Sequence, residues 1–327
     1  MRVEPLLIKH WLIRKGEKCG FHLLSMKRFR PVDARSHEGN PLALSYRHPG
    51  RRLLLDAPVA WGFGLFNFPF GRPRPLAGVI PRALANPGQE RALIREALVA
   101  FYQAWQPRSA AEFFGLDRCE SEALDALPTW LSPWPWDPLT LEQKRIQRRR
   151  AEERENARVL GKELGLEAGW KFCGPVSELK LHVEVERLAR LVESIRTHGV
   201  RRHDGTDGDI RALVLSHPDG RWRWQVLVGQ HRYAVISALG QERIAIRVEQ
   251  FVRRQEVMLW PGVASGLFTP SAALKVFDDC FSEGGRCIEQ ELPEAVTTGQ
   301  EPREPNQGES HDELEASSEQ VGPGTPG

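Results

Sequence analysis

The sequence lacks long hydrophobic runs. Nowhere do about 18 apolar residues follow one another, so no membrane-spanning helix is expected. The first residues place charges on both sides of a short apolar stretch and show no small-residue cleavage site, so they do not predict a signal peptide. We therefore expect a cytoplasmic protein that does not insert into a membrane.

Cysteine is scarce and scattered. No two cysteines form a Cys-x-x-Cys pair, so neither a structural zinc site nor a disulfide framework is indicated. A reducing cytosol fits this usage best. The five positions are Cys19, Cys119, Cys173, Cys280 and Cys287.

Net charge is also low, at +2 in 327 residues, but it is unevenly distributed. Residues 291–327 hold nine acidic residues, one basic residue and no aromatic residue, so the remainder of the chain carries about +10. A segment of this composition buries too little apolar surface to offset its conformational entropy. We expect residues 291–327 to form a disordered acidic tail, and the basic remainder to favour phosphate-bearing partners.

Residues 1–140 carry few regular patterns. Apolar residues recur at helical spacing between 89 and 106, and a second short helix is expected from Ser109 to about Gly115. The aromatic run 61–70 is expected to pack against another element, because so apolar a segment is rarely exposed. We expect an α-rich N-terminal domain of unknown type.

Two segments separate this region from the rest of the chain. Proline and tryptophan alternate over 127–138, which predicts extended chain at a domain boundary. Residues 141–173 read as a charged helical linker, in which Arg148, Arg149 and Arg150 face acids at helical pairing distance. A solvated, salt-bridged helix is the favoured interpretation. A nucleic-acid patch is the alternative, and the interleaved glutamates weaken it because they cancel the positive field.

Residues 174–290 show clearer periodicity. An apolar helical face around 188–195 ends at Gly199, and strands are expected at 210–215, 221–228 and 244–248. The alternation of Trp222, Trp224, Val226 and Val228 with polar or smaller residues is the sharpest strand pattern in the chain. A helix is expected at 231–239, so the order is helix, strand, turn, strand, glycine turn, helix, strand.

The junction between the second strand and the second helix has the chemistry of an anion site. A helix N-terminus presents unpaired N–H groups and a partial positive charge. Gly229 lets the backbone approach a ligand closely, and a guanidinium such as that of Arg232 suits forked contacts with phosphate. A buried, structurally satisfied His231–Arg232 pair is the alternative.

The segment Gly229–Ala234, which reads GQHRYA and is followed by Leu239-Gly240, resembles the nucleotide-binding motif of the ParB/sulfiredoxin superfamily. The upstream run 188–195 resembles the helix that precedes the paired strands in that family. The likeness covers residues 174–250 and implies that ATP or another nucleoside phosphate rests on the turn and on the helix after it. The implied nucleotide-binding residues are Gly229, Gln230, His231, Arg232 and Tyr233.

The sequence departs from each branch of that family. Gln230 stands where sulfiredoxin has its catalytic cysteine, so reduction of a sulfinic acid is not expected. Partition ParB proteins carry Gly-Glu-Arg-Arg at this turn and a helix-turn-helix downstream, and no clear counterpart follows here. Free-serine kinases carry Asp-Gly-His-His-Arg, whereas this chain has Val228 in place of the aspartate. Trp260-Pro261 matches a segment of those kinases.

Three acids are candidates for chemistry. In the kinases a catalytic glutamate follows a histidine before the first helix, and His182-Val183-Glu184 is the nearest match, which makes Glu184 the candidate general base. The loop 203–209 is rich in aspartate, and Asp207 and Asp209 could hold Mg²⁺ beside phosphates. A solvated turn is the alternative for this loop.

We therefore expect an α+β protein with an N-terminal domain (1–140), a linker (141–173), a ParB/sulfiredoxin-like nucleotide-binding domain (174–290) and a disordered tail (291–327). The first hypothesis is a phosphotransferase or nucleotide hydrolase acting on a small molecule. The second is a non-catalytic nucleotide-dependent switch with a small-molecule or protein partner. The third is a DNA-associated partition or regulatory factor, which the missing helix-turn-helix disfavours.

Overall fold

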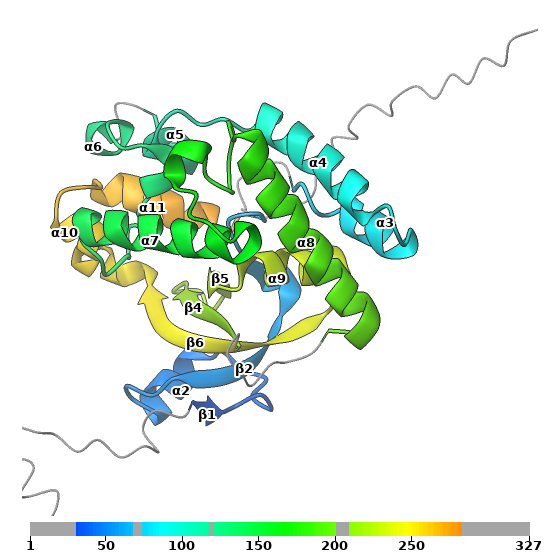
Figure 1. The fold of residues 1–327 in the computed structure, drawn as a ribbon. Coiled ribbons are helices and arrows are strands. Elements are labelled where there is room, and N and C mark those ends of the chain that lie inside the picture. The colour runs from blue at the N-terminus through cyan, green and yellow to red at the C-terminus, as the bar shows by residue number, and fades with distance from the viewer. Residues whose placement is uncertain (1–30, 68–73, 118–120, 201–208, 283–327) are drawn as a thin grey trace, which may run out of the picture. The chain divides into compact units, whose positions relative to one another are not determined.

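The computed structural model describes residues 31–67, 74–117, 121–200 and 209–282, and its centre is a mixed sheet (Figure 1). The six strands lie in the order β1-β2-β6-β4-β5-β3. The pairs β2–β6 and β4–β5 are antiparallel, and β4–β6, β1–β2 and β3–β5 are parallel. The strands are β1 (Val32–Asp33), β2 (Leu53–Pro58), β3 (Gly62–Phe63), β4 (Ile210–Ser216), β5 (Trp222–Val228) and β6 (Arg243–Arg253).

The central segment follows the predicted order of elements. Helix α8 (Glu178–His198) leads to β4 and β5, α9 (Gln230–Ala238) follows Gly229, and β6 completes the unit. The strand expected at 244–248 continues to Arg253. The expectation that Glu184 precedes the first helix is wrong, because Ser177 caps α8 and places Glu184 in its second turn.

The N-terminal segment joins the same sheet. All six residues of β2 pair with β6, from Leu53 opposite Val248 to Pro58 opposite Arg243. The described residues accordingly all fall within one compact unit, Met1–Cys287. The structure therefore does not divide at residue 140 as the sequence suggested, because the hydrogen-bond partners of β2 lie far away in sequence and local periodicity does not encode them.

The proline- and tryptophan-rich stretch is core and not a domain boundary. Trp134 and Trp136 are buried and stack on each other with ring centroids 5.2 Å apart. The indole nitrogen of Trp136 donates a 3.0 Å hydrogen bond to the side chain of Gln225 on β5. The expectation of extended chain holds only in part, because Thr129–Leu131 form a 3-10 turn within the stretch, and the indoles fill the space between the sheet and α11 (Pro270–Asp279).

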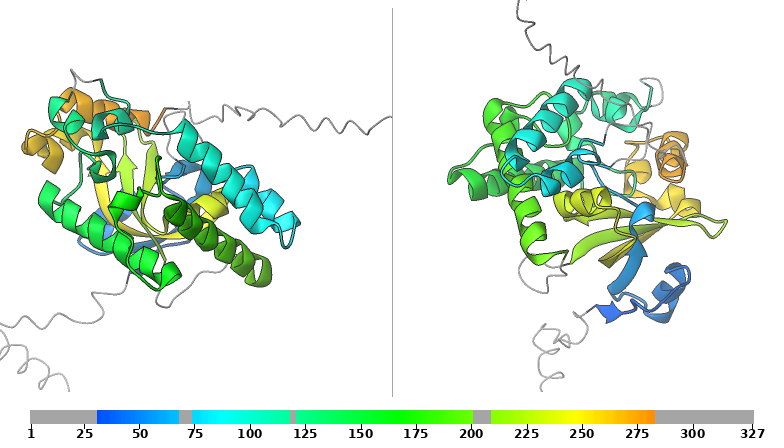
Figure 2. Two further views of the ribbon diagram at one scale, coloured as in Figure 1. Left: turned by 45° about the horizontal axis from the view of Figure 1, so that its top comes forward. Right: turned by 90° about the vertical axis from the view of Figure 1, so that its right-hand side faces the viewer.

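The alternation along β4 assigns its side chains to two apolar clusters. Ile210, Ala212 and Val214 pack in one cluster with α2 (Leu42–Arg47), whereas Leu213 and Leu215 pack in the other with most of the helices. Figure 1 and Figure 2 show these layers, with α2 on one side of the sheet and α3 to α8 on the other. Helix α9 contributes to both clusters and packs against β5 and α8.

The remaining helices complete the larger cluster. The helix predicted at 89–106 is α4, and Ser109 and Gly115 cap α5 as expected. Within the described ranges, no helix combines the length and the apolarity needed to cross a bilayer. The predicted tail 291–327 lies outside these ranges. The helices are α3 (Val79–Ala85), α4 (Glu90–Ala104), α5 (Ala110–Phe114), α6 (Glu122–Asp125), α7 (Leu141–Leu160) and α10 (Pro261–Ala264), with 3-10 turns at Val59–Trp61, Thr129–Leu131, Leu166–Ala168 and Arg254–Leu259.

Candidate functional site

Gly229 makes the sharp turn between β5 and α9. Its backbone has φ 100° and ψ 26°, a left-handed conformation that residues with a Cβ rarely adopt. A Cβ built there would lie 3.2 Å from Cγ1 of Ile210 on the neighbouring strand. The first N–H groups of α9 have no acceptor within the helix and point out of its N-terminus, as in any α-helix. The turn therefore requires glycine at position 229, both for its left-handed backbone and for its close approach to Ile210.

Gln230 holds the turn against the N-terminal segment. Its side-chain oxygen accepts a 2.8 Å hydrogen bond from the backbone N–H of Leu65, and its side-chain nitrogen donates a 2.7 Å hydrogen bond to the carbonyl of Val226. A Cβ at Gly64 would approach that oxygen to 2.5 Å, so the two segments are in close contact. The side-chain amide of Gln230, which was predicted as a nucleotide ligand, therefore already forms hydrogen bonds with two backbone groups of the protein.

Tyr233, also predicted as a nucleotide ligand, lies in the core. Its side chain is 2% exposed, and its hydroxyl lies 2.5 Å from the carbonyl oxygen of Gly62 and 3.2 Å from that of Val59. Burial raises the pKa of the phenol. Tyr233 therefore anchors α9 to the segment that links β2 and β3, and it offers little surface to a ligand.

His231 is fixed by its neighbours and remains partly exposed. Its Nε2 lies 2.7 Å from Oε2 of Glu184 on α8, and its ring lies 5.1 Å from the ring of Phe66. The side chain is 19% exposed. If the imidazole is neutral, Nε2 carries the proton that Glu184 accepts, and Nδ1 is the basic nitrogen. Arg232 follows in the same turn of α9 and is also partly exposed.

Glu184 is completely buried, and cations surround it. Its Oε1 lies 2.8 Å from Nζ of Lys180 and 2.9 Å from a guanidinium nitrogen of Arg187, while Oε2 faces His231. Burial alone would raise the pKa of Glu184. The charge of Lys180, the hydrogen bond from His231 and the charge of Arg187 outweigh burial and hold this pKa well below 4.5. Glu184 is therefore an ionised carboxylate.

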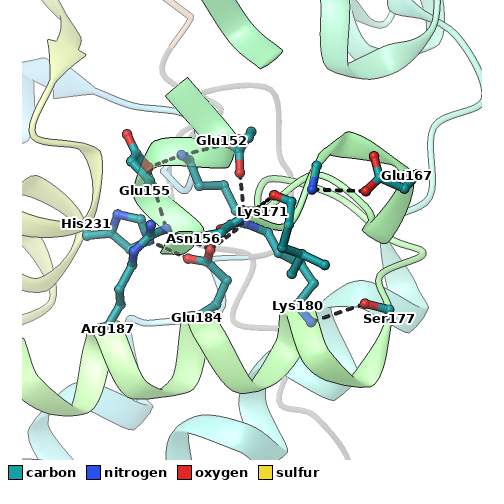
Figure 3. Close-up of polar contacts among 12 residues, drawn as sticks. Glu152, Glu155, Asn156, Glu167, Lys171, Ser177, Lys180, Glu184, Arg187 and His231 are labelled. Atoms are coloured by element: carbon teal, nitrogen blue, oxygen red, sulfur yellow. Dashed lines mark hydrogen bonds and ion pairs between the residues drawn. The ribbon is translucent and has the colours of Figure 1, made fainter. Parts of the chain in front are cut away.

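The contacts of Glu184 continue into a buried ionic network (Figure 3). Lys180 also binds Glu152 and Asn156 on α7, each at 2.8 Å. Lys171 binds Glu152 at 2.8 Å and Glu155 at 2.5 Å. Three carboxylates thus face three cations, and His231 stands at the end of the network nearest to the glycine turn. The charges of Lys171 and Lys180 keep the pKa of Glu152 low despite its burial.

This geometry changes the role expected for Glu184. A general base must reach the proton that it removes, and both oxygens of Glu184 are already occupied by protein groups. Glu184 instead orients the ring of His231, as a carboxylate behind an imidazole does at many functional sites. Of the two side chains, Glu184 is completely buried and His231 is partly exposed, so only His231 has surface that a ligand could reach.

The predicted metal site falls partly outside the described residues. Asp207 lies outside them, and Asp209 immediately precedes β4 and is partly exposed. In the part of the chain that the structure describes, no group of three or more histidine, cysteine, aspartate or glutamate side chains is close enough to hold a metal ion. The proposal that Asp207 and Asp209 bind Mg²⁺ remains untested by this geometry.

Sequence reasoning missed most of the network. Lys180, Glu184 and Arg187 stand at spacings of four and three residues on one face of α8, a pattern that could have indicated their mutual contacts. The partners on α7 could not be found in this way. Glu152 and Glu155 were expected to pair with Arg148–Arg150 along the helix, and their carboxylates instead bind Lys171 and Lys180.

Comparisons with models of known families, with curated proteins and with solved structures gave no match to this chain.

Proposed function

We propose that the chain binds a nucleoside phosphate, such as ATP, whose phosphates rest on the turn Gly229–Arg232 and on the N-terminus of α9. The observation that carries this proposal is the position of His231, which a buried carboxylate on α8 holds at that helix terminus. A helix N-terminus favours anions through its free N–H groups and its dipole. His231 and Arg232 add side-chain donors to that site.

Positive charge on the neighbouring strand supports the proposal. Arg211 on β4 is the register partner of Val228, the residue before Gly229. Arg211, Arg247 and Arg52 all bind Glu249, at 3.0, 2.8 and 2.8 Å. Three guanidinium groups on one carboxylate leave an excess of positive charge beside the turn. Such an excess favours a ligand with several negative charges, such as a triphosphate.

The proposed kinship with the ParB/sulfiredoxin superfamily gains support from topology. The element order α8, β4, β5, α9 and β6, with the glycine turn between β5 and α9, is the order that the resemblance implies. Gln230 binds the backbone of Leu65 and Val226 in the position of the sulfiredoxin cysteine, so that chemistry is not part of the proposal.

Of the two hypotheses, an enzyme acting on a nucleotide phosphate and a non-catalytic nucleotide-dependent switch, the contacts of Glu184 favour the switch. Glu184 has no oxygen left to accept a substrate proton, and Val228 replaces the aspartate of the kinase-like motif. His231 lies at the meeting point of the glycine turn and the network that joins α8 to α7. Binding of a phosphate at His231 would therefore act on the contact between these helices.

Isothermal titration calorimetry with ATP, with and without Mg²⁺, tests the proposal. The parent chain should bind, and Arg232→Ala should weaken binding about 10- to 100-fold, the effect of losing one charge-assisted hydrogen bond. Arg47→Ala is the matched control, because Arg47 is an exposed arginine in the last turn of α2, on the side of the sheet opposite to α8 (Figure 1). Equal affinities for the parent and for Arg232→Ala would remove the turn from the site.

An ADP-release assay separates the catalytic version from the switch. A parent chain that binds ATP without turning it over, alone or with small-molecule hydroxyl acceptors, would support the switch. Sustained turnover that His231→Gln abolishes would support phosphate transfer or hydrolysis instead, with His231 as the candidate base.

A further inference from the structure

The outer side of α7 carries unbalanced positive charge. The helix holds seven basic and four acidic residues, and the sequence alone suggests that these acids pair with basic residues of the same helix. The structure separates these charges. Glu152 and Glu155, half of the acids, direct their carboxylates to Lys171, Lys180 and Arg187 on other segments.

Five of the seven basic residues are exposed, whereas Lys144 is buried against Asp137 and Arg148 packs over the ring of Trp170. Within the described ranges, Arg149, Arg150, Arg154 and Arg158 have no ion-pair partner, and Arg145 approaches Glu142 only to 3.9 Å. Glu142 and Glu153 are the acids left on this side, so the outward-facing charge of α7 is about +3. The inward acids neutralise buried cations and cannot also screen these arginines.

Three of the arginines form a row. Arg150, Arg154 and Arg158 stand one helical turn apart, which places them along about 12 Å of the helix axis at 1.5 Å per residue. They line a shallow, open depression together with Ala157, Glu153 and Glu163. A row of guanidinium groups with free N–H donors matches the forked hydrogen bonding that phosphate oxygens accept.

We propose that this row, Arg150, Arg154 and Arg158, is a docking surface for the phosphodiester backbone of a nucleic-acid duplex. A duplex presents about one negative charge per 1.7 Å of its axis, so several phosphates fall within the length of the row. Helix α7 contains no aromatic residue, so it offers no base-stacking platform for single strands. Among its large apolar side chains only Ile146 is exposed, and one isoleucine is too little apolar surface to insert the helix into a membrane. None of the residues that line this depression belongs to the turn Gly229–Arg232.

Fluorescence anisotropy of a labelled duplex of about 30 base pairs, as DNA and as RNA, tests the proposal on the full chain over a range of salt concentrations. The triple variant Arg150→Gln/Arg154→Gln/Arg158→Gln should lose at least about tenfold in affinity at low salt. Its plot of log K against log salt should be less steep by about 2.7, the change expected when three phosphate contacts are lost. The two duplexes show whether DNA or RNA is preferred.

The matched control removes the same charge elsewhere. Arg47→Gln/Arg82→Gln/Arg190→Gln replaces three exposed arginines on α2, α3 and α8, and its affinity should stay within about twofold of the parent. Glu153→Gln, which removes an acid from the depression, should tighten binding, a gain that misfolding cannot produce.

Three results would overturn the proposal. The first is a parent chain that binds neither duplex at low salt. The second is an equal loss of affinity in the two triple variants, which would indicate a diffuse charge effect. The third is binding to phosphatidylserine vesicles that depends on the α7 arginines while the duplexes remain unbound, which would assign the row to a lipid surface.

Discussion

His231 and Glu184 lie 47 residues apart in the sequence and are in contact at the candidate site. The imidazole is held by a carboxylate that is itself held by Lys180 and Arg187. The sequence placed His231 and Arg232 at a helix start and named Glu184 as a candidate general base. It could not predict the contact between His231 and Glu184, because that contact depends on how α8 packs against α9, and residue spacing within one helix does not encode this packing.

At the residue scale, Glu184→Gln should be strongly destabilising. The change keeps the shape of the side chain but leaves the buried Lys180 and the partly buried Arg187 with one carboxylate fewer, and the loss of a buried charge partner typically costs about 3–5 kcal/mol. Glu178→Gln is the control on the same helix, because Glu178 is 78% exposed and should change stability by less than about 1 kcal/mol. Urea denaturation near neutral pH measures both, and equal costs would show that the network contributes little.

The pH dependence of stability follows from the same carboxylates. The pKa values of Glu152, Glu155 and Glu184 are all lowered in the folded chain, below the ordinary value of 4.5. Their contribution is therefore fully present above about pH 4.5, where they are ionised in both states, and is lost as the pH falls through the folded pKa values. The free energy of unfolding of the parent should decrease on acidification below about pH 4.5, and that of Glu184→Gln should decrease less. Parallel profiles would contradict this assignment.

At the scale of elements, the parts with strong local patterns were predicted and the parts with remote partners were not. The alternation along β5 and the capping residues of α5 predicted those elements well. The contacts of Glu152 and Glu155 with Lys171 and Lys180 were not predicted. In the sequence, the charge pattern of α7 is that of a solvated helix, and only the packing of the chain shows which lysines lie beside it. The same separation of charge leaves the outer row of arginines exposed.

The turn between β5 and α9 gives a prediction at this scale. Gly229→Ala adds a Cβ at positive φ, and that Cβ meets Ile210 at 3.2 Å. Gly220→Ala is the matched control, since Gly220 has φ 89° and open space around its Cβ. Gly220→Ala should cost about 1–2 kcal/mol from backbone strain alone, and Gly229→Ala should cost more and weaken ATP binding. Equal stability losses with unchanged ATP affinity would show that the close approach at Gly229 is unimportant.

At the scale of the whole molecule, the sheet joins segments that the sequence seemed to divide. Strand β2 comes from the first third of the chain and pairs with β6 along its whole length, and Trp136 reaches across to Gln225 on β5. Sequence patterns identified the α+β class, because helix and strand periods are local. They could not show that the apolar run of β2 pairs with β6, a strand almost 200 residues further along the chain.

This shared sheet predicts the behaviour of a fragment. A chain restricted to residues 141–290 would lose β2, the antiparallel partner of β6, and would also lose Trp134 and Trp136 from the core. An exposed edge strand and an unfilled core oppose folding, so the fragment should show no cooperative thermal transition. Near-ultraviolet circular dichroism measures this directly. A sharp transition with native-like aromatic signals would establish 141–290 as an independent domain.

The most direct test of the proposed site is ¹⁵N-histidine labelling of the full chain, which carries ten histidines, followed by titration with ATP in an NMR experiment. The His231→Gln variant assigns the signal of His231. The backbone amide of His231, in the first turn of α9, should shift in proportion to bound ATP, while that of His48, at the end of α2, should not move. An unmoved His231 signal at saturating ATP, with shifts confined to other histidines, would contradict a phosphate site at this turn.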